Sequence, residues 1–283
     1  MKPVPGVAFV LGLLVVAAGA AASIATLVWR GSFPDPTPAP ALNRMLAEAR
    51  GYSAATLLVA VPLALASLRA SSRGSIRGRV IWIGSLVYFV YTYLEFAVSP
   101  PFTALYLLYV AAFACAIPAL VMAVASIDVS GLHDTFGPRV PRRSVAVFSL
   151  ALAALLALTW LRGIVSQSLA GSFGWPVGAD AVGHVVHALD LGLQVPLCIA
   201  AGVLLLRRRP AANLVAAIML VNDSCMGSAL TAMVVWSSLA SGASPWNAWP
   251  FAVAWGFAIA LAVAFLFGPA AKRSSDRSPS RGA

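Results

Sequence analysis

Charged residues are scarce in this chain. Asp, Glu, Lys and Arg together make up 10% of its 283 residues, whereas hydrophobic residues make up 60%. Soluble proteins use about 25% charged residues, so this composition excludes an ordinary soluble domain. No single soluble core could bury so much apolar surface, and we therefore expect a lipid bilayer to surround the chain.

Cysteine is also rare. Cys115, Cys198 and Cys225 lie far apart within apolar runs, which excludes a disulfide framework or a cysteine-rich metal cluster. The chain lacks a phosphate-binding loop, a serine-nucleophile elbow and a dinucleotide-binding fingerprint. His133 lies in a predicted loop on the opposite side of the membrane from His184 and His187, which open the sixth apolar run. We therefore predict no catalytic residues of a known type, no metal and no other cofactor.

Apolar runs are long and regularly spaced. Eight of them can each cross a bilayer, which takes roughly 20 helical residues. They cover about residues 6–29, 51–68, 80–98, 104–126, 144–166, 184–206, 214–236 and 250–267. The sequence therefore predicts an all-α, polytopic transmembrane helix bundle of about eight spans.

Two segments near the N-terminus allow alternatives. The first run could be a cleaved signal peptide, but its 24 residues exceed the usual apolar core of about 7–15, and we favour a retained span. Residues 42–49 have a helical apolar face, which predicts a short helix at the membrane surface or an ordinary solvated loop helix.

Basic residues outnumber acidic ones, and the formal net charge is +10. They lie in short clusters between the runs, so we expect no nucleic-acid partner. With eight spans, 15 of the 19 Lys and Arg residues fall on one side, including those in residues 69–79 and 207–209. This bias predicts that both termini are cytoplasmic. Five tryptophans would form an aromatic belt at the outer interface: Trp29, Trp160, Trp236, Trp246 and Trp249.

Short motifs recur in the two halves of the chain. Val61-Pro62-Leu63 in the second run reappears 134 residues later as Val195-Pro196-Leu197 in the sixth. We predict two four-span halves in parallel repeat, residues 1–143 and 144–271, followed by a disordered basic tail over 272–283. Chance similarity of apolar sequence is the alternative. Both prolines should open the helical hydrogen-bond ladder.

Polar residues within a span are functional candidates. His184, His187 and Asp190 open the sixth run at intervals of three residues. A His–Asp pair one turn apart suits proton relay, or an imidazole held by a carboxylate. The alternative is that His184 caps the helix while His187 and Asp190 bond each other and join helices.

The seventh run carries a second acid. Asp223 lies ten residues beyond Asn213, or roughly 15 Å into the membrane. A carboxylate at that depth costs about 2.5–3.5 kcal/mol, so Asp223 should face other helices and be paired or protonated. It is a candidate proton carrier, and with Asn222 and Ser224 it could instead hold a hard cation.

The third run carries an acid near its end. Tyr88, Tyr91 and Glu95 share one helical face, and Glu95 lies about 24 Å beyond Arg79. These residues could line a cavity, with Arg162 as a counter-ion for Glu95. The alternative is that the tyrosines anchor the helix at the interface while Glu95 extends toward water.

Several stretches resemble a family of bacterial multi-pass integral membrane proteins that carry no assigned function. The similar stretches are residues 72–79, 91–93, 107–111 and 207–210. The family pattern has Asn in place of Thr92 and a Lys near Asn222, which this chain lacks. The resemblance implies a multi-pass protein of the bacterial cytoplasmic membrane and implies no chemistry.

These observations favour a small-molecule or ion permease with proton-linked buried acids. The first alternative is an intramembrane enzyme that acts on a lipid or prenyl substrate with His187 and Asp190 as acid and base. The second is a structural or sensory membrane subunit. The sequence predicts neither the substrate nor the oligomeric state.

Overall fold

The computed structural model describes residues 5–34, 40–99, 101–128, 140–171, 179–209 and 211–268. These residues form helices and connections without any strand, and eight of their helices are long and apolar enough to cross a membrane. The predicted all-α bundle of eight spans is thus confirmed. His133 and the predicted disordered tail lie outside the described residues.

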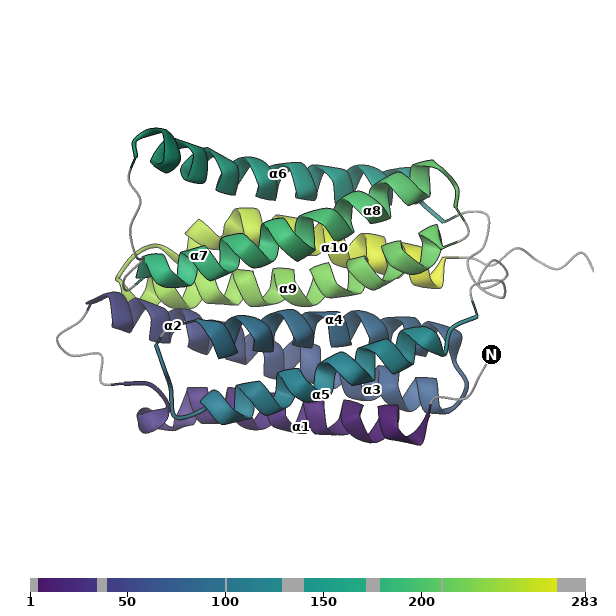
Figure 1. Cartoon of the computed structure of the whole chain (residues 1–283), viewed down its shortest axis with the longest axis horizontal. Helices are drawn as coiled ribbons and strands as arrows, with labels where there is room; N and C mark the ends of the chain where they lie inside the picture. The colour runs from purple at the N-terminus through teal and green to yellow at the C-terminus, as the bar shows by residue number, and fades with distance from the viewer. Residues whose placement is uncertain are drawn as a thin grey trace, which may run out of the picture.

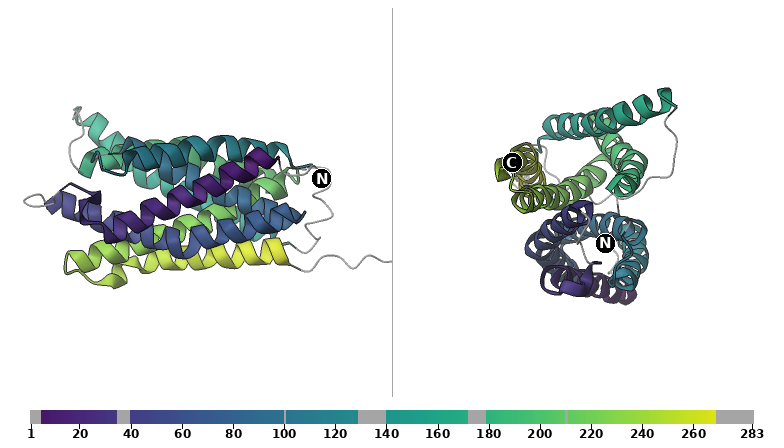
Figure 2. Two further views of the ribbon diagram at one scale, coloured as in Figure 1. Left: turned by 90° about the horizontal axis from the view of Figure 1, so that it is seen from below. Right: turned by 90° about the vertical axis from the view of Figure 1, so that its left-hand side faces the viewer.

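The helices run side by side along one axis in two groups (Figures 1 and 2). The first group contains α1 (Gly6–Val28), α2 (Pro40–Ala55), α3 (Val61–Ser72), α4 (Ile76–Val98) and α5 (Tyr106–Ala125). The second contains α6 (Arg142–Leu169), α7 (Ala179–Leu189), α8 (Val195–Leu206), α9 (Ala212–Ala240) and α10 (Trp249–Phe267). Short 3₁₀ turns, η1 (Arg30–Ser32) and η5 (Pro245–Ala248), follow α1 and precede α10.

Small residues bring the helices of the first group close together. A Cβ on Gly12 of α1 would lie 2.9 Å from the Trp82 ring, and one on Gly19 would lie 2.7 Å from the Tyr93 hydroxyl oxygen. Glycines at such positions allow close helix packing in membranes, where packing rather than water exclusion drives association. The N-terminal helix is therefore an integral part of this group.

The outward faces are apolar. Large hydrophobic side chains remain exposed along most spans, and five of the most exposed are Leu58, Leu107, Leu155, Leu158 and Phe257. A water-soluble protein rarely exposes so much contiguous apolar surface. These faces suit contact with lipid.

The two groups meet where α2 and α4 pack against α9. Gly51 of α2 lies against the backbone of Ala232, and Gly84 of α4 lies against Val221. By contrast, α6 packs along α8 but barely touches α10, and it lies at the edge of the bundle in Figure 1. The second group is therefore more open than the first.

Two π-helical turns interrupt the second and sixth spans. They are η2 (Thr56–Ala60), between α2 and α3, and η4 (Asp190–Gln194), between α7 and α8. Each directly precedes a Val-Pro-Leu sequence, so the two turns are also 134 residues apart. Because proline has no N–H, the ladder must shift at this point. The predicted opening of the ladder is confirmed, and the division into 1–143 and 144–271 stays a prediction.

The predicted separate helix over residues 42–49 is wrong. These residues are the first turns of α2, which continues through η2 into α3 as one span. No proline or other strong helix breaker separates them from Gly51, and packing of α2 along α9 supports the longer helix.

One arginine of the basic segment 69–79 is buried. Arg79 is 2% exposed, and its guanidinium donates hydrogen bonds to the Ser71 hydroxyl and to the backbone carbonyl and hydroxyl of Ser126. Ser126 is the C-cap of α5. Arg79 therefore ties the ends of α3, α4 and α5 together, rather than serving only as a topogenic charge.

Candidate functional site

Asp190 begins the second π-helical turn and joins three helices. Its Oδ1 accepts a hydrogen bond of 2.7 Å from the Tyr91 hydroxyl of α4, and its Oδ2 accepts one of 2.8 Å from the Trp160 indole of α6. Asp190 is 8% exposed. Because both carboxyl oxygens accept, the arrangement fits an ionised acid.

The predicted His187–Asp190 hydrogen bond is wrong: within the described part of the chain, none joins these two residues. The His187 ring instead packs against Trp160, with ring centroids 4.3 Å apart, while His184 is exposed with its ring centroid 6.0 Å from that of His187. The hydrogen bond that the His187 imidazole was expected to donate to Asp190 is donated by the Trp160 indole instead.

A second polar cluster lies deeper, between α9 and the end of the π-helical turn; we call Gln194, Asn222 and Asp223 the Asp223 cluster. The Gln194 amide donates to Asp223 Oδ1 at 2.6 Å. The Asn222 amide donates to the same oxygen at 3.2 Å and to Gln194 Oε1 at 3.1 Å. All three residues are buried. Ser224 does not join them, because its hydroxyl donates to the Leu220 carbonyl.

Two oxygens of the Asp223 cluster have no partner among the described residues: Asp223 Oδ2 and Asn222 Oδ1. Buried acceptors are nearly always satisfied, and exceptions indicate a missing ligand, a water or a proton. A carboxylate oxygen and an amide oxygen can each accept a hydrogen bond or coordinate a cation. The pairing expected for Asp223 is therefore present on one oxygen only.

Hydroxyl groups extend the polar region toward the first π-helical turn. The Tyr52 hydroxyl shares a hydrogen bond of 3.0 Å with Thr92, and the Tyr88 hydroxyl shares one of 2.6 Å with Thr56. Tyr88 therefore turns toward η2, whereas Tyr91 turns toward η4. Tyr88 and Tyr91, which were predicted to share one face of α4, therefore bond two different segments, η2 and η4.

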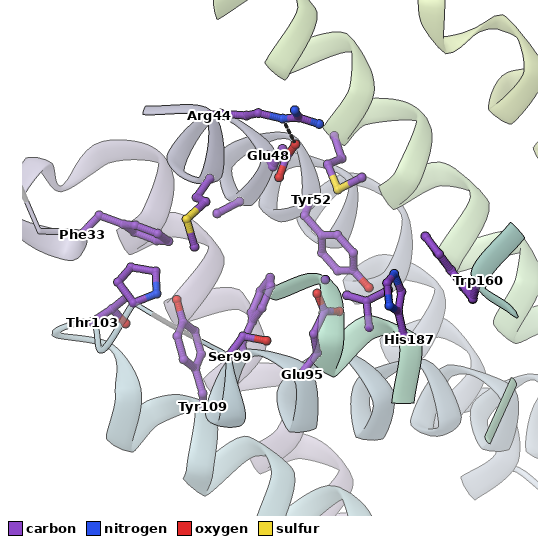
Figure 3. Close-up of a pocket in the computed structure, with 17 residues that line it drawn as sticks. Phe33, Arg44, Glu48, Tyr52, Glu95, Ser99, Thr103, Tyr109, Trp160 and His187 are labelled. Atoms are coloured by element: carbon purple, nitrogen blue, oxygen red, sulfur yellow. Dashed lines mark hydrogen bonds and ion pairs between the residues drawn. The ribbon is translucent and has the colours of Figure 1, made fainter. Parts of the chain in front are cut away.

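A pocket of about 440 Å³ opens at the end of the bundle that holds the C-terminal end of α4. We call it the Glu95 pocket. Figure 3 shows Tyr52, Glu95 and His187 converging on it from α2, α4 and α7. Arg44 and Glu48 also line it, and they form an ion pair of 2.8 Å.

The predicted pairing of Glu95 with Arg162 is wrong. Arg162 is exposed on α6 and does not line the pocket, because it lies two residues beyond Trp160 and therefore points away from the face of α6 that reaches the pocket. Glu95 is partly buried, and its carboxyl group forms neither a hydrogen bond nor an ion pair with any residue that the structure describes.

The pocket is connected to the two buried acids, Asp190 and Asp223, through the residues between them. Trp160 and His187 line the pocket, and the Trp160 indole is bonded to Asp190. Asp190 begins the turn that Gln194 ends, and Gln194 is bonded to Asp223. Two hydrogen bonds, one at each end of the π-helical turn, therefore connect the pocket lining to the centre of α9 through this turn.

Sequence reasoning missed three residues of this region. Trp160 was assigned to an aromatic belt, yet it is partly buried, whereas Trp29, Trp236, Trp246 and Trp249 are 39% exposed or more. Gln194 shares a helical face with Asp190, and although this spacing is visible in the sequence, Gln194 was not included in the predicted site. Tyr52 gave no signal beyond its polar group inside a span.

No three His, Cys, Asp or Glu side chains of the described ranges lie close enough together to hold a metal ion. Comparison of the chain with protein-family models, curated proteins and solved structures gives no match in any of the three. The likeness to bacterial multi-pass proteins thus rests on short motifs alone. The described residues thus form a helical protein with eight helices long and apolar enough to cross a membrane, and with a small number of buried polar side chains.

Proposed function

We propose that this protein is a permease for a small molecule or ion, and that Asp190 and Asp223 carry the coupling ion, a proton being the one that these acids suit best. The observation that carries the proposal is the Asp223 cluster, where a buried carboxyl and a buried amide each keep one oxygen unpartnered. Such oxygens can accept a proton or coordinate a cation and can release it again.

The cost of these acids supports a role beyond packing. An aspartate at the centre of a spanning helix costs about 2.5–3.5 kcal/mol on the insertion scale. A polar network that only joins helices is most stable when every member is satisfied, and the Asp223 cluster is not. Ionisable residues within a membrane more often mark ion or substrate pathways.

The Glu95 pocket supplies the solute site in this proposal. Its volume of about 440 Å³ falls within the range of roughly 300–1,000 Å³ that ligand pockets occupy. Because Trp160 lines the pocket and holds Asp190, occupancy of the pocket can affect the hydrogen bonds of this acid. Solute binding and ion binding then share one side chain.

A helix-joining role is the second candidate, and one observation favours it. Asp190 ties α4, η4 and α6 together through Tyr91 and Trp160, and such bonds between spans stabilise a bundle. The intramembrane-enzyme alternative loses its main support, because the His187–Asp190 acid–base pair is not formed.

We further infer that the protein resides in a bacterial cytoplasmic membrane with both termini inside. The described chain begins and ends at the same end of the bundle (Figure 1), and Arg73, Arg77, Arg142 and Arg208 lie at that end. Clusters of basic residues favour the cytoplasmic side. Labelling of single cysteines placed at 74 and 242 from outside spheroplasts should modify only the second.

Reconstitution tests the proposed activity. Proteoliposomes under an inward proton or sodium gradient would be offered radiolabelled cationic, neutral and anionic solutes. We expect gradient-dependent uptake of one class, its loss in Asp223→Asn, and its retention in Ser224→Ala, where the altered hydroxyl bonds only the backbone. Uptake that survives Asp223→Asn would contradict the proposal. If no solute enters and the substitution only lowers stability, the helix-joining role is correct.

A further inference from the structure

The Glu95 pocket combines one uncompensated acid with aromatic walls. Glu95 has no ion-pair partner among the described residues, and the other formally charged side chains that line the pocket are Arg44 and Glu48. Glu48 is neutralised by Arg44 at 2.8 Å. The formal charges that line the pocket therefore sum to one negative charge, which belongs to Glu95.

Aromatic rings surround this charge on several sides. Phe33, Tyr52, Phe96 and Tyr109 line the pocket together with Glu95. The Phe96 ring packs against Tyr52 and Tyr109 with centroids 5.4 and 5.3 Å apart, so these rings form one continuous wall. Figure 3 shows Phe33 and Tyr109 on the side of the pocket opposite His187.

This combination selects for one kind of ligand. Aromatic faces attract cations through the negative charge of the ring face, and the attraction increases when the cation is desolvated. A carboxylate adds charge complementarity, whereas an anion would be repelled by Glu95 and would not be favoured by the ring faces. A small hydrated metal ion would gain little from the apolar part of the wall.

We infer that the Glu95 pocket binds a monovalent organic cation, such as an amine or a quaternary ammonium compound with an apolar substituent. Glu95 is its counter-ion, and Phe33, Tyr52, Phe96 and Tyr109 enclose its apolar part. This inference deepens the proposed function by naming the class of solute, and it rests on that proposal only for the step of transport. Binding is a property of the pocket itself.

The test measures binding, which requires no gradient and no transport. Isothermal titration calorimetry of the purified full chain in detergent would compare phenyltrimethylammonium with benzoate, an anion of similar size. We expect saturable binding of the cation and none of benzoate. Glu95→Gln should weaken cation binding at least tenfold, and Phe33→Leu should weaken it several-fold by removing one aromatic face.

A matched control lies outside the pocket. Arg162→Gln removes a charge from the exposed face of α6, away from the pocket lining, and we expect its affinity to stay within threefold of the wild type. Thermal unfolding of each variant would verify that it is folded. Should Glu95→Gln fail to fold, the preference of the wild type for the cation over benzoate still decides the question.

Several results would overturn the inference: no binding of phenyltrimethylammonium by the folded wild type, binding of benzoate with equal affinity, or undiminished cation binding by folded Glu95→Gln. Cation binding without uptake into proteoliposomes would support the pocket and contradict the permease. Gradient-driven uptake of a neutral or anionic solute without cation binding would support the permease and contradict the cation site in the pocket.

Discussion

The two π-helical turns have the same backbone conformation but carry different side chains. Each lies directly before a Val-Pro-Leu sequence, and their first residues, Thr56 and Asp190, are 134 positions apart. In the first turn the sequence is Thr-Leu-Leu-Val-Ala, with a neutral hydroxyl at Thr56 and a methyl at Ala60. In the second it is Asp-Leu-Gly-Leu-Gln, so that Asp190 and Gln194 occupy the corresponding positions.

Their surroundings differ in the same sense. Thr56 shares one short hydrogen bond with Tyr88, and Ala60 packs in the core of the first group. Asp190 and Gln194 instead connect a pocket residue, Trp160, to the Asp223 cluster. The widened turn therefore follows from the proline, whereas the candidate site follows from the side chains that η4 carries.

The largest difference should appear when each turn loses its polar group. Asp190→Asn removes the charge that the coupling ion requires, and we expect gradient-driven uptake into proteoliposomes to fall to the level of empty vesicles. Thr56→Val removes a hydroxyl of the same position in the first turn, and uptake should stay near the wild-type rate. Equal loss in both variants would mean that the turns share a structural role.

The next largest effect concerns the packing beside the first turn. Gly51 lies against the backbone of Ala232, and the position 134 residues later is Val185, where the second group is more open. Gly51→Val should lower the free energy of unfolding by about 3 kcal/mol, the upper part of the usual cost of overpacking. Unfolding in detergent, followed by circular dichroism, would measure this loss. An unchanged midpoint would show that the contact between α2 and α9 is not tight.

A smaller contrast separates the hydrogen bonds of the two turns. A double-mutant cycle of Tyr91→Phe with Asp190→Asn should give a coupling energy of up to about 1.7 kcal/mol, the largest value typical between membrane helices. The cycle of Tyr88→Phe with Thr56→Val should give the average, about 0.6 kcal/mol. The first pair includes a carboxylate, which strengthens its bond. A reversed order would indicate that Asp190 is neutral in the folded protein.

The smallest effect is expected at Gly192. A side chain there would meet nothing within 4 Å, and the first turn carries Leu58 at this position, which is 78% exposed. Gly192→Leu should therefore change the free energy of unfolding by no more than about 0.5 kcal/mol, as for other open surface positions. A loss well beyond that value would reveal a neighbour that packs on this face of the turn.

Much of the fold could be predicted because length and hydropathy determine it. Spanning helices need roughly 20 apolar residues, and the eight runs are recovered as helices whose ends differ from the predicted ones by a few residues, except that the second span begins at Leu42. The two prolines predicted the interruptions of the second and sixth spans. The surface helix was misjudged because residues 42–49 are too polar for a span, although they extend one.

Less of the site could be predicted, because its partners are distant in sequence. Asp190 and Asp223 were identified from the cost of burying a carboxylate. The partners of Asp190 are Tyr91 and Trp160, 99 and 30 residues away, and spacing along one helix cannot reveal contacts between helices. Arg162 was paired with Glu95 on depth alone, but the two residues lie on helices that do not bring them together.

The proposed coupling of solute uptake to proton movement through Asp223 is tested by the internal pH of proteoliposomes during uptake. Vesicles loaded with a pH-sensitive dye would contain either the wild type or Asp223→Asn, and the solute that the wild type accumulates would be added outside. The account predicts a change in internal pH that accompanies uptake in wild-type vesicles and is absent with Asp223→Asn. Solute uptake with no change in internal pH, or an equal change in both preparations, would contradict it.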